Sequence, residues 1–382
     1  MTAETPLAYR IAMSVEDRTV RVWDLPVRLF HWLLVAMVAI GVFTGFVAPE
    51  WWMGIHTWAG YTIVALLAFR IVWGFFGSEY SHIASFTHSG RAVIDHLRGL
   101  VMLRPVHHLG HNPAGAVMIV ALVFVLTAIT VTGLLELGGE ENQGPLAGFA
   151  GFGVGVAAKS IHRSLVILLL AMVGGHLLGV LVESWLGRDN LVRAMFTGNK
   201  KLPENSPRPQ PRGARPGAAT LTMIVFTALA GGFLVMAERM PPTGLVALPV
   251  NENYRTECGD CHMAFHPSLL PAESWRGLMA SLDDHFGEDA SLEPDLRDEI
   301  TQYLTAHASE NWGTEAANYF RRVSPEAPWQ ITATPYWVRK HHEVKNSRFA
   351  NPKVRSKSNC VACHSDAASG RFDDQNIHMP GA

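Results

Sequence analysis

Long apolar runs alternate with polar segments in the first part of the chain. Five runs are long enough to cross a bilayer as helices, since about 20 apolar residues span its hydrocarbon core. They cover residues 29–48, 53–75, 113–137, 160–186 and 219–238. From about residue 250 the composition becomes that of a water-soluble domain. The pattern predicts an all-α protein with five membrane helices and a soluble part behind them.

The soluble part, residues 250–382, has little regular periodicity. Glu293 and Pro294 begin its clearest helix, because proline is favoured in the first turn. Ile300 and Leu304 then fall on one face of that helix. Since the remainder is rich in loops, this part buries only a modest core of its own. Large apolar cofactors are therefore expected to help fill it.

Basic residues are unevenly shared among the segments between the apolar runs. Arginines gather before the first run, between the second and third, and after the fourth, whereas the remaining loops carry Glu50, Glu140 and Glu141. The positive-inside rule therefore predicts a cytoplasmic N-terminus. An odd number of spans then places residues 250–382 in the periplasm, and the membrane is the inner membrane of a bacterium.

Composition adds few constraints to this picture. The formal net charge is −2 over 382 residues, so nothing favours binding to nucleic acid. The polar N-terminus lacks a cleavable signal, so export of the soluble part is attributed to the internal spans. The predicted segments are a cytoplasmic N-terminus (1–20), a four-helix membrane domain (21–197), a cytoplasmic linker rich in proline and arginine (198–218), a fifth span (219–240) and a periplasmic domain (250–382).

Four histidines lie inside the apolar runs, where ionisable side chains are costly and usually functional. His162 and His176 are separated by about four helical turns, so both rings leave the same face of one helix. Depth pairs His31 with His176 near the cytoplasmic side and His56 with His162 near the outer side. Two haem b groups, each held by two histidines, fit this arrangement. The alternative is that the histidines join helices through hydrogen bonds.

Three further polar residues flank the spans. His111 precedes the third span, which itself contributes no ligand. It could line a quinone or a haem-propionate pocket, but the sequence favours neither assignment. Arg28 and Arg70 lie at cytoplasmic helix ends. Pairing with haem propionates and extension to lipid headgroups explain the two arginines equally well.

The four cysteines form two Cys-x-x-Cys-His motifs, at residues 258–262 and 360–364. This spacing lets both thiols bond the vinyl groups of one haem while the adjacent imidazole reaches the iron. A four-cysteine zinc site and a redox dithiol are the alternatives, but neither requires the histidine that follows both motifs. Two haem c groups are therefore expected, held by Cys258 and Cys261 with His262, and by Cys360 and Cys363 with His364.

The second axial ligand of each haem c is less directly marked. His266 follows its motif too closely, because four residues span at most about 14 Å and must turn around the porphyrin edge. His285 has room and is the better partner for the first haem. For the second haem, the adjacent His341 and His342 both have room, as does His378.

The membrane part contains several recognisable stretches. They are VWDLPVRLFHW (Val22–Trp32), HTWAGY (His56–Tyr61), LGHNPAGA (Leu109–Ala116) and GRDNLVRAM (Gly187–Met195). With the spacing of His162 and His176, they make residues 20–197 similar to the prokaryotic cytochrome b561 family, which includes hydrogenase-type b cytochromes. The resemblance implies exchange of electrons with the quinone pool and two b haems, ligated at His31, His56, His162 and His176.

The soluble part has matching stretches of its own. Besides the first Cys-x-x-Cys-His motif they are LLPAESWRGLMASLDDHFGEDASL (Leu269–Leu292), ITATPYWVRKH (Ile331–His341) and NCVACHSDAASGRF (Asn359–Phe372). They make residues 254–382 resemble the bacterial dihaem cytochrome c that donates electrons to an oxygen-binding monohaem cytochrome. The resemblance implies bis-histidine haems with His285 and His341 as distal ligands. His342 lies next to His341, so the choice between His341 and His342 stays open. Which distal histidine serves which haem also stays open.

These features together predict a membrane-bound tetrahaem electron-transfer protein, with a four-helix haem b bundle, a fifth transmembrane helix and a loop-rich, mainly α periplasmic dihaem cytochrome c domain. Electrons would pass from quinol via two b haems and two c haems to a soluble periplasmic acceptor, such as an oxygen-binding monohaem cytochrome c. One alternative is inward flow from a periplasmic hydrogenase- or dehydrogenase-like partner to quinone, and another is a haem-based sensor. Membrane lipid is an expected partner. Whether the chain is a simple carrier or a quinol:cytochrome c oxidoreductase stays open, as does a homodimer.

Overall fold

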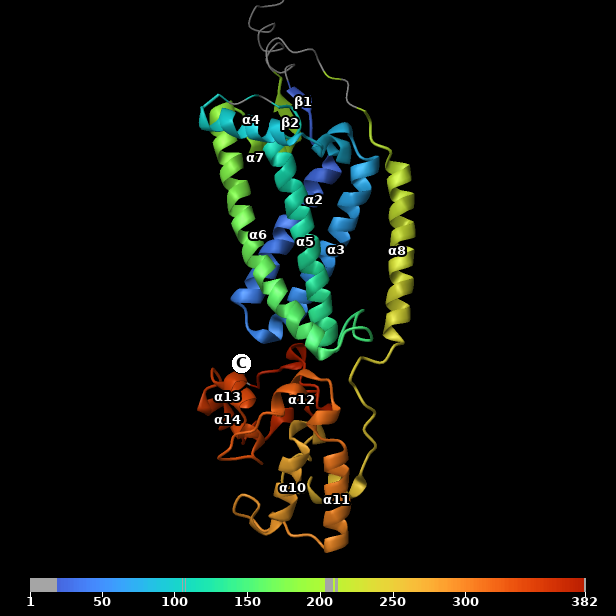
Figure 1. Cartoon of the computed structure of the whole chain (residues 1–382), viewed down its shortest axis with the longest axis vertical. Coiled ribbons are helices and arrows are strands. Elements are labelled where there is room, and N and C mark those ends of the chain that lie inside the picture. Colours follow the sequence, from blue (N-terminus) through green and yellow to red (C-terminus); the bar gives the residue numbers. More distant parts are fainter. Residues whose placement is uncertain (1–18, 105, 107, 203–208, 210–211, 381–382) are drawn as a thin grey trace, which may run out of the picture. The chain divides into compact units, whose positions relative to one another are not determined.

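The computed structural model describes residues 19–104, 106, 108–202, 209 and 212–380, and the chain divides into two compact units (Figure 1). The first unit comprises the described parts of residues 1–46, 55–131 and 161–232. The second comprises 47–54, 132–160 and the described parts of 233–382. Most of the predicted cytoplasmic N-terminus, and residues 203–208 and 210–211 of the predicted linker, lie outside the described residues.

Five helices of the described chain are long and apolar enough to cross a membrane, as the sequence predicts. Their outer faces expose large apolar side chains, which suits contact with lipid rather than with water. Inner faces of four of them pack together, with Ile63, Leu67, Leu126, Ile129 and Leu169 buried among them. The five helices are α2 (Leu25–Phe46), α3 (Met53–Phe76), α5 (Pro113–Gly139), α6 (Phe152–Gly187) and α8 (Pro216–Glu238).

Helix α6 begins earlier than the sequence pattern indicates, at Phe152 rather than Ser160. The glycines of this first stretch favour a loop when only the sequence is considered. In the structure, an added Cβ on Gly155 would collide with the backbone of Gly139 and Glu140. The glycine therefore allows the α5 and α6 backbones to approach closely, as small residues do between membrane helices.

Helix α2 also begins earlier than predicted, at Leu25, because the preceding residue caps it. Asp24 accepts a hydrogen bond from the Val27 backbone N–H at 2.9 Å. The same carboxylate accepts from Trp73 Nε1 at 3.0 Å and from Ser78 Oγ at 2.7 Å. It thereby ties the start of α2 to the end of α3.

A small sheet and two short helices occupy the same end of the first unit. Strand β1 (Thr19–Arg21) pairs antiparallel with β2 (Asn199–Lys201), with Thr19 opposite Lys201; strands this short were not predicted. Helix α7 (Leu191–Thr197) precedes β2 and ends at Gly198, whose φ of +84° suits glycine. Helix α4 (Gly90–Val101) is capped by Ser89 and lies across the ends of α5 and α6 (Figure 1).

The larger part of the second unit is a loop-rich domain with short helices around one core. The predicted helix after Glu293 is confirmed as α11, and Ile300 and Leu304 are buried in the core. Trp275 is buried beside them and donates from Nε1 to the Pro267 carbonyl at 2.7 Å. The helices are α9 (Glu252–Glu257), α10 (Ala272–Ala280), α11 (Pro294–Ala306), α12 (Glu315–Phe320), α13 (Pro335–His341) and α14 (Asn346–Phe349).

Candidate haem-binding sites

His56 of α3 and His162 of α6 face each other in the first unit, and their ring centroids are 6.2 Å apart. An imidazole nitrogen bonds a transition metal at about 2.0–2.1 Å and the ring centre lies about 1 Å further out, so two rings on opposite sides of one metal have centroids about 6–6.5 Å apart. The pair therefore has the separation that a single iron ion requires. This is the outer pair that depth alone predicts.

Backbone carbonyls orient both rings of this pair. His56 Nδ1 donates to the Gly41 carbonyl at 3.1 Å, and His162 Nδ1 donates to the Ile129 carbonyl at 2.9 Å. Fixing Nδ1 in this way leaves Nε2 for the metal, which is the usual arrangement around metal-bound histidine. Gly45 also contributes, because a Cβ there would lie 3.4 Å from His56 Cε1.

The inner histidines, His31 of α2 and His176 of α6, are also brought together, since they lie close enough to interact electrostatically. His31 Nδ1 is buried and has no hydrogen-bond partner among the described residues. Burial of a polar atom without a hydrogen-bond partner costs free energy, unless a further group binds to it. The pair thus supplies two imidazole donors, the type of ligand that haem iron takes.

The two arginines proposed for haem propionates have partners within the chain. Arg28 Nη1 donates to the Phe196 carbonyl, and Arg70, which is buried, donates to the Ser81 carbonyl at 3.2 Å. The Arg70 guanidinium also lies over the Phe86 ring at 5.1 Å. Neither arginine extends freely to the headgroup region.

His111 is packed among aromatic and basic side chains at the same end of the unit. Its ring centroid lies 4.5 Å from that of Trp23 and 4.7 Å from that of Phe86, and its Nδ1 is buried without a partner in the described chain. Burial, and then the charges of Arg70 and Lys200, lower the pKa of His111 to about 3. The imidazole is therefore neutral near pH 7 and can exchange a hydrogen bond with a ligand.

In the second unit, His262 of the first Cys-x-x-Cys-His motif lies opposite His285, with ring centroids 6.2 Å apart. His262 Nδ1 donates to the Met263 carbonyl at 2.8 Å, and the His285 backbone N–H donates to the Glu288 backbone carbonyl at 2.8 Å. Burial lowers the pKa of His285, which favours the neutral form that binds metal. This pair too has the spacing for one iron.

His266, the nearer alternative, is engaged in the core instead. It is buried, its Nδ1 lies 2.8 Å from Ser268 Oγ, and its ring meets Trp312 edge-on at 4.6 Å. Gly370 packs so closely against this ring that a Cβ would collide with it. The surroundings of His266 are those of a structural side chain.

His364 of the second motif lies opposite His341, with ring centroids 6.1 Å apart. His341 Nδ1 donates to the Trp337 carbonyl at 2.9 Å, and its ring stacks on Trp337 at 4.3 Å. Burial, followed by the neighbouring His341, lowers the pKa of His364 to about 4. His342 and His378 are exposed, and the His342 ring donates to the Arg339 carbonyl at 2.7 Å.

One cysteine thiol of each motif, Cys258 and Cys360, lies where burial disfavours the thiolate form. Burial, and then the charge of Glu257, raise the pKa of Cys258 to about 11, and burial raises that of Cys360 to about 11. A redox dithiol or a zinc thiolate requires a lowered thiol pKa. Among the described residues no group of three or more His, Cys, Asp or Glu side chains is placed to hold a metal ion by itself. The raised pKa of Cys258 and Cys360 fits thioether-linked haem better than a redox dithiol or a zinc thiolate.

Sequence reasoning overlooked two residues near these sites: Trp337, which stacks on His341, and Asp24, which ties the start of α2 to the end of α3. Asp24 and Trp337 lie inside stretches that the resemblances quote, yet neither was given a role. The spacing of Trp337 and His341 was an available signal, because residues four apart share a helix face. The carbonyls of Gly41 and Ile129 leave no such signal, since every residue has one.

Two family models match the chain. The model described as prokaryotic cytochrome b561 matches residues 22–198, and the model described as dihaem cytochrome c matches residues 254–372. Neither match reaches into the segment that holds α8.

Among curated proteins, the similar ones are subunits of hydrogenases. The probable Ni/Fe-hydrogenase 1 B-type cytochrome subunit of Escherichia coli K12 is 28% identical over 211 residues, which cover 46% of this chain and 88% of that protein. The probable Ni/Fe-hydrogenase B-type cytochrome subunit of Rhizobium leguminosarum bv. viciae is 24% identical over 219 residues, 49% of this chain and 91% of that protein.

Among solved structures, the similar ones correspond to the second unit. A dihaem cytochrome c from Rhodobacter sphaeroides is 45% identical and is covered completely by 33% of this chain, with a TM-score of 0.29. A dihaem cytochrome c from Shewanella baltica is 39% identical, with 35% of this chain covering 95% of it and a TM-score of 0.29.

Proposed function

Because the chain belongs to the dihaem cytochrome c family through residues 254–372 and joins to it a prokaryotic cytochrome b561 region at residues 22–198, we propose that it carries electrons from quinol in the membrane to a soluble periplasmic acceptor. The chain is an integral membrane electron-transfer cytochrome with b-type haem in its spans and c-type haem in its soluble part. The route, direction and partners are the proposed steps.

We assign the axial ligands from the ring pairs. His31 with His176 and His56 with His162 would hold the two b haems, while His262 with His285 and His364 with His341 would hold the two c haems. Haem supplies one-electron chemistry at each of these positions. The chain's own contribution is to fix the rings through Nδ1 hydrogen bonds and to exclude water by burial.

The observation that carries the proposal is the separation of the ring pairs, 6.1–6.2 Å in three of them. Two protein ligands on each iron leave no open coordination position for a gas or substrate. The pairs therefore favour electron transfer over a haem-based sensor, which needs a five-coordinate iron. Carbon monoxide should leave most of the reduced spectrum unchanged, and a large shift would support the sensor instead.

We place the quinol site next to His111. A quinol hydroxyl can exchange a hydrogen bond with the neutral imidazole of His111, which lies beside the aromatic rings of Trp23 and Phe86. The basic residues Arg70 and Lys200 beside it would stabilise the negative charge that develops as quinol loses protons.

Addition of a soluble quinol to the purified, haem-loaded chain tests the direction of flow. In phosphatidylcholine nanodiscs with no partner protein, the b-haem band should be reduced first and the c-haem band afterwards. A monohaem periplasmic cytochrome c added next should become reduced in turn. If quinol leaves both bands oxidised while dithionite reduces them, the proposed route is wrong.

Replacement of His111 tests the placement of the site. His111→Ala should slow reduction by quinol about tenfold, the effect of losing one hydrogen bond at about 1.4 kcal/mol, and leave reduction by dithionite unchanged. His82→Ala, a half-buried histidine of the same loop, is the matched control and should reduce normally. Equal effects of the two changes would contradict the placement.

Inward flow is the second candidate, and the hydrogenase subunits among the similar proteins favour it. In that case a periplasmic redox enzyme would deliver electrons to the chain, which would reduce quinone. The same nanodiscs decide between the two directions. With the c haems held reduced by ascorbate and a mediator, rapid formation of quinol together with failure of quinol to reduce the c haems would support inward flow.

A further inference from the structure

Helix α4 presents three distinct faces. With 100° between successive residues, Ile94, Leu97 and Val101 fall within about 60° of one another. The charged residues Arg91, Asp95 and Arg98 occupy a face about a quarter turn away. His96 points in a third direction, is buried, and lies 5.5 Å from the His108 ring. Only this third face packs against the rest of the unit.

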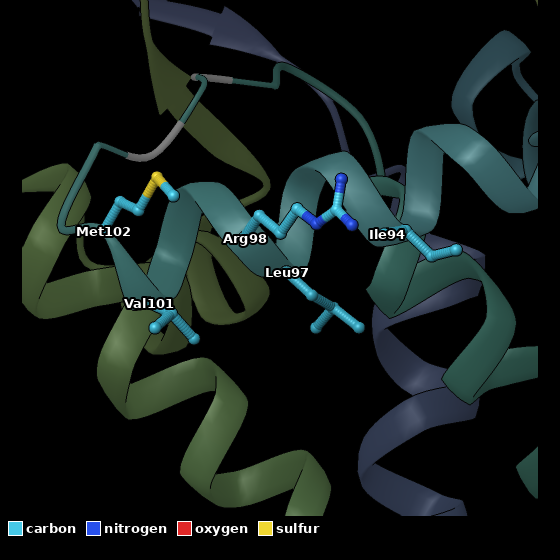
Figure 2. Close-up of a pocket in the computed structure, with 5 residues that line it drawn as sticks. All are labelled: Ile94, Leu97, Arg98, Val101 and Met102. Carbon is cyan, nitrogen blue, oxygen red and sulfur yellow. The ribbon is translucent and has the colours of Figure 1, made fainter.

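The apolar face of α4 is unusually exposed. Val101 is 83% exposed and Met102 69%, and with Ile94, Leu97 and Arg98 they line a hollow of about 260 Å³. Figure 2 shows Leu97 and Val101 pointing away from the helix toward the side on which the spans run, and Ile94 pointing away from the helix to the right. Such a patch is not stable in water and marks a contact with an apolar partner.

The position of the helix identifies that partner. At 12 residues α4 is too short to cross a bilayer, and it lies across the ends of spans α5 and α6 rather than along them (Figure 1). A helix placed in this way meets the boundary between lipid headgroups and acyl chains. Its apolar face turns toward the acyl chains and its charged face toward water, as in interfacial amphipathic helices.

The charge of this segment selects among lipids. Residues 90–104 carry Arg91, Arg98 and Arg104 against the single acid Asp95, a net charge of +2. Arg91 and Arg98 are 92% and 71% exposed in their side chains, and each approaches Asp95 only to 3.9 Å. Their guanidinium N–H groups thus remain available to a phosphate, which arginine binds in a bidentate manner.

We propose that α4 binds an acidic phospholipid of the leaflet at this end of the bundle. The acyl chains lie against Ile94, Leu97 and Val101, and the phosphate contacts Arg98 with Arg91 beside it. His96, on the opposite face, packs against His108 and joins α4 to the unit, so the lipid and the unit contact different faces of the helix. The site is independent of the proposed electron route.

Native mass spectrometry of the full, haem-loaded chain tests the proposal. The chain is titrated in detergent with phosphatidylglycerol or with phosphatidylcholine of the same acyl chains, and wild type should bind phosphatidylglycerol more tightly. Arg98→Gln should weaken that binding about fivefold, and Arg91→Gln combined with Arg98→Gln about 25-fold, from the contribution of each basic residue near acidic lipid. Leu97→Ser with Val101→Ser should weaken binding of both lipids.

Arg193→Gln is the matched control, because Arg193 is exposed on α7, in the same unit, and loses the same charge. It should leave the affinity unchanged. Equal affinity of wild type for the two lipids, or an equal effect of Arg193→Gln and Arg98→Gln, overturns the proposal. Displacement of phosphatidylglycerol by inorganic phosphate would assign the arginines to a free anion, and a dimer lost on Leu97→Ser would assign the face to a second copy. Should a variant lose its b-haem spectrum, the two-lipid comparison on wild type decides alone.

Discussion

The membrane part and the soluble part bring histidine rings to the same separation by different means. His56 and His162 come from two long helices, and their 6.2 Å separation depends on how α3 and α6 pack. His262 and His285 reach 6.2 Å in a loop-rich domain, where one ring follows a cysteine pair directly. In the membrane part, the packing of rigid helices holds the two rings in place, and no cysteine links the haem to the chain. In the soluble part, covalent attachment of the haem to two cysteines allows a small, irregular core to hold it.

Removal of one membrane ligand should have the largest effect, because nothing else holds that haem. His162→Ala leaves His56 as the single axial ligand of an untethered group, so the outer b haem should be lost. A pyridine haemochrome assay should then give a b-to-c ratio near one half, compared with about one for wild type. A ratio that stays near one would show that His162 is not a ligand.

The equivalent change in the soluble part should keep its haem. His285→Ala removes the distal ring, but the thioether bonds at Cys258 and Cys261 and the proximal His262 would remain. We expect an unchanged b-to-c ratio and the conversion of one c haem to a high-spin spectrum. If His285→Ala instead leaves both c haems low-spin, another side chain is the ligand. Loss of the haem altogether would show that the contrast between the two parts is wrong.

The same contrast explains how much of the sites could be predicted from the sequence. The Cys-x-x-Cys-His motifs are local, so spacing along the chain suffices to find them. The membrane histidines are found because depth in a straight helix is proportional to sequence number. The choice between His341 and His342 requires the geometry of α13, where Trp337 lies one turn before His341 and stacks on it.

The fold shows the same division. Five apolar runs predict five spans, because lipid demands continuous helices. The early start of α6 was missed because Gly155 is a packing position for α5, a role that depends on a distant segment. The pairing of β1 with β2 was missed because strands of three residues have no periodicity to detect.

Replacement of Asp24 tests how much its hydrogen bonds contribute to the stability of the membrane helices. Burial alone would raise the pKa of Asp24, but hydrogen bonds from Ser78, Val27 and Trp73 outweigh burial and lower it. Asp24→Asn weakens these hydrogen bonds and should lower the free energy of unfolding of the first unit by about 1–3 kcal/mol. The loss should not be larger, because the carboxylate is partly exposed and screened by solvent. Thermal loss of the b-haem Soret band should occur several degrees lower, while the c-haem band melts as in wild type.

The pH dependence of this contribution follows from its sign. Because the folded state lowers the pKa of Asp24, the carboxylate contributes stability above its usual pKa of 3.8 and loses that contribution as the pH falls below it. Wild type and Asp24→Asn should therefore differ at neutral pH and converge under acid conditions. A difference that does not depend on pH would assign the effect to side-chain shape rather than to charge.

The smallest effect is expected at His342. This variant tests whether the position of the ring, rather than the presence of a histidine, decides which residue binds the iron. His342 is exposed and its ring donates to the Arg339 carbonyl at 2.7 Å, so His342→Ala should change stability by less than about 0.5 kcal/mol and leave both c haems low-spin. His341→Ala, one residue earlier, removes the ring that lies 6.1 Å from His364, and should make one c haem high-spin. The visible spectra of the two purified variants check this directly. A high-spin His342→Ala with a normal His341→Ala would mean that α13 turns its other face to the iron. The irregular core of the soluble part would then be less able than the spans to fix a ring without its haem.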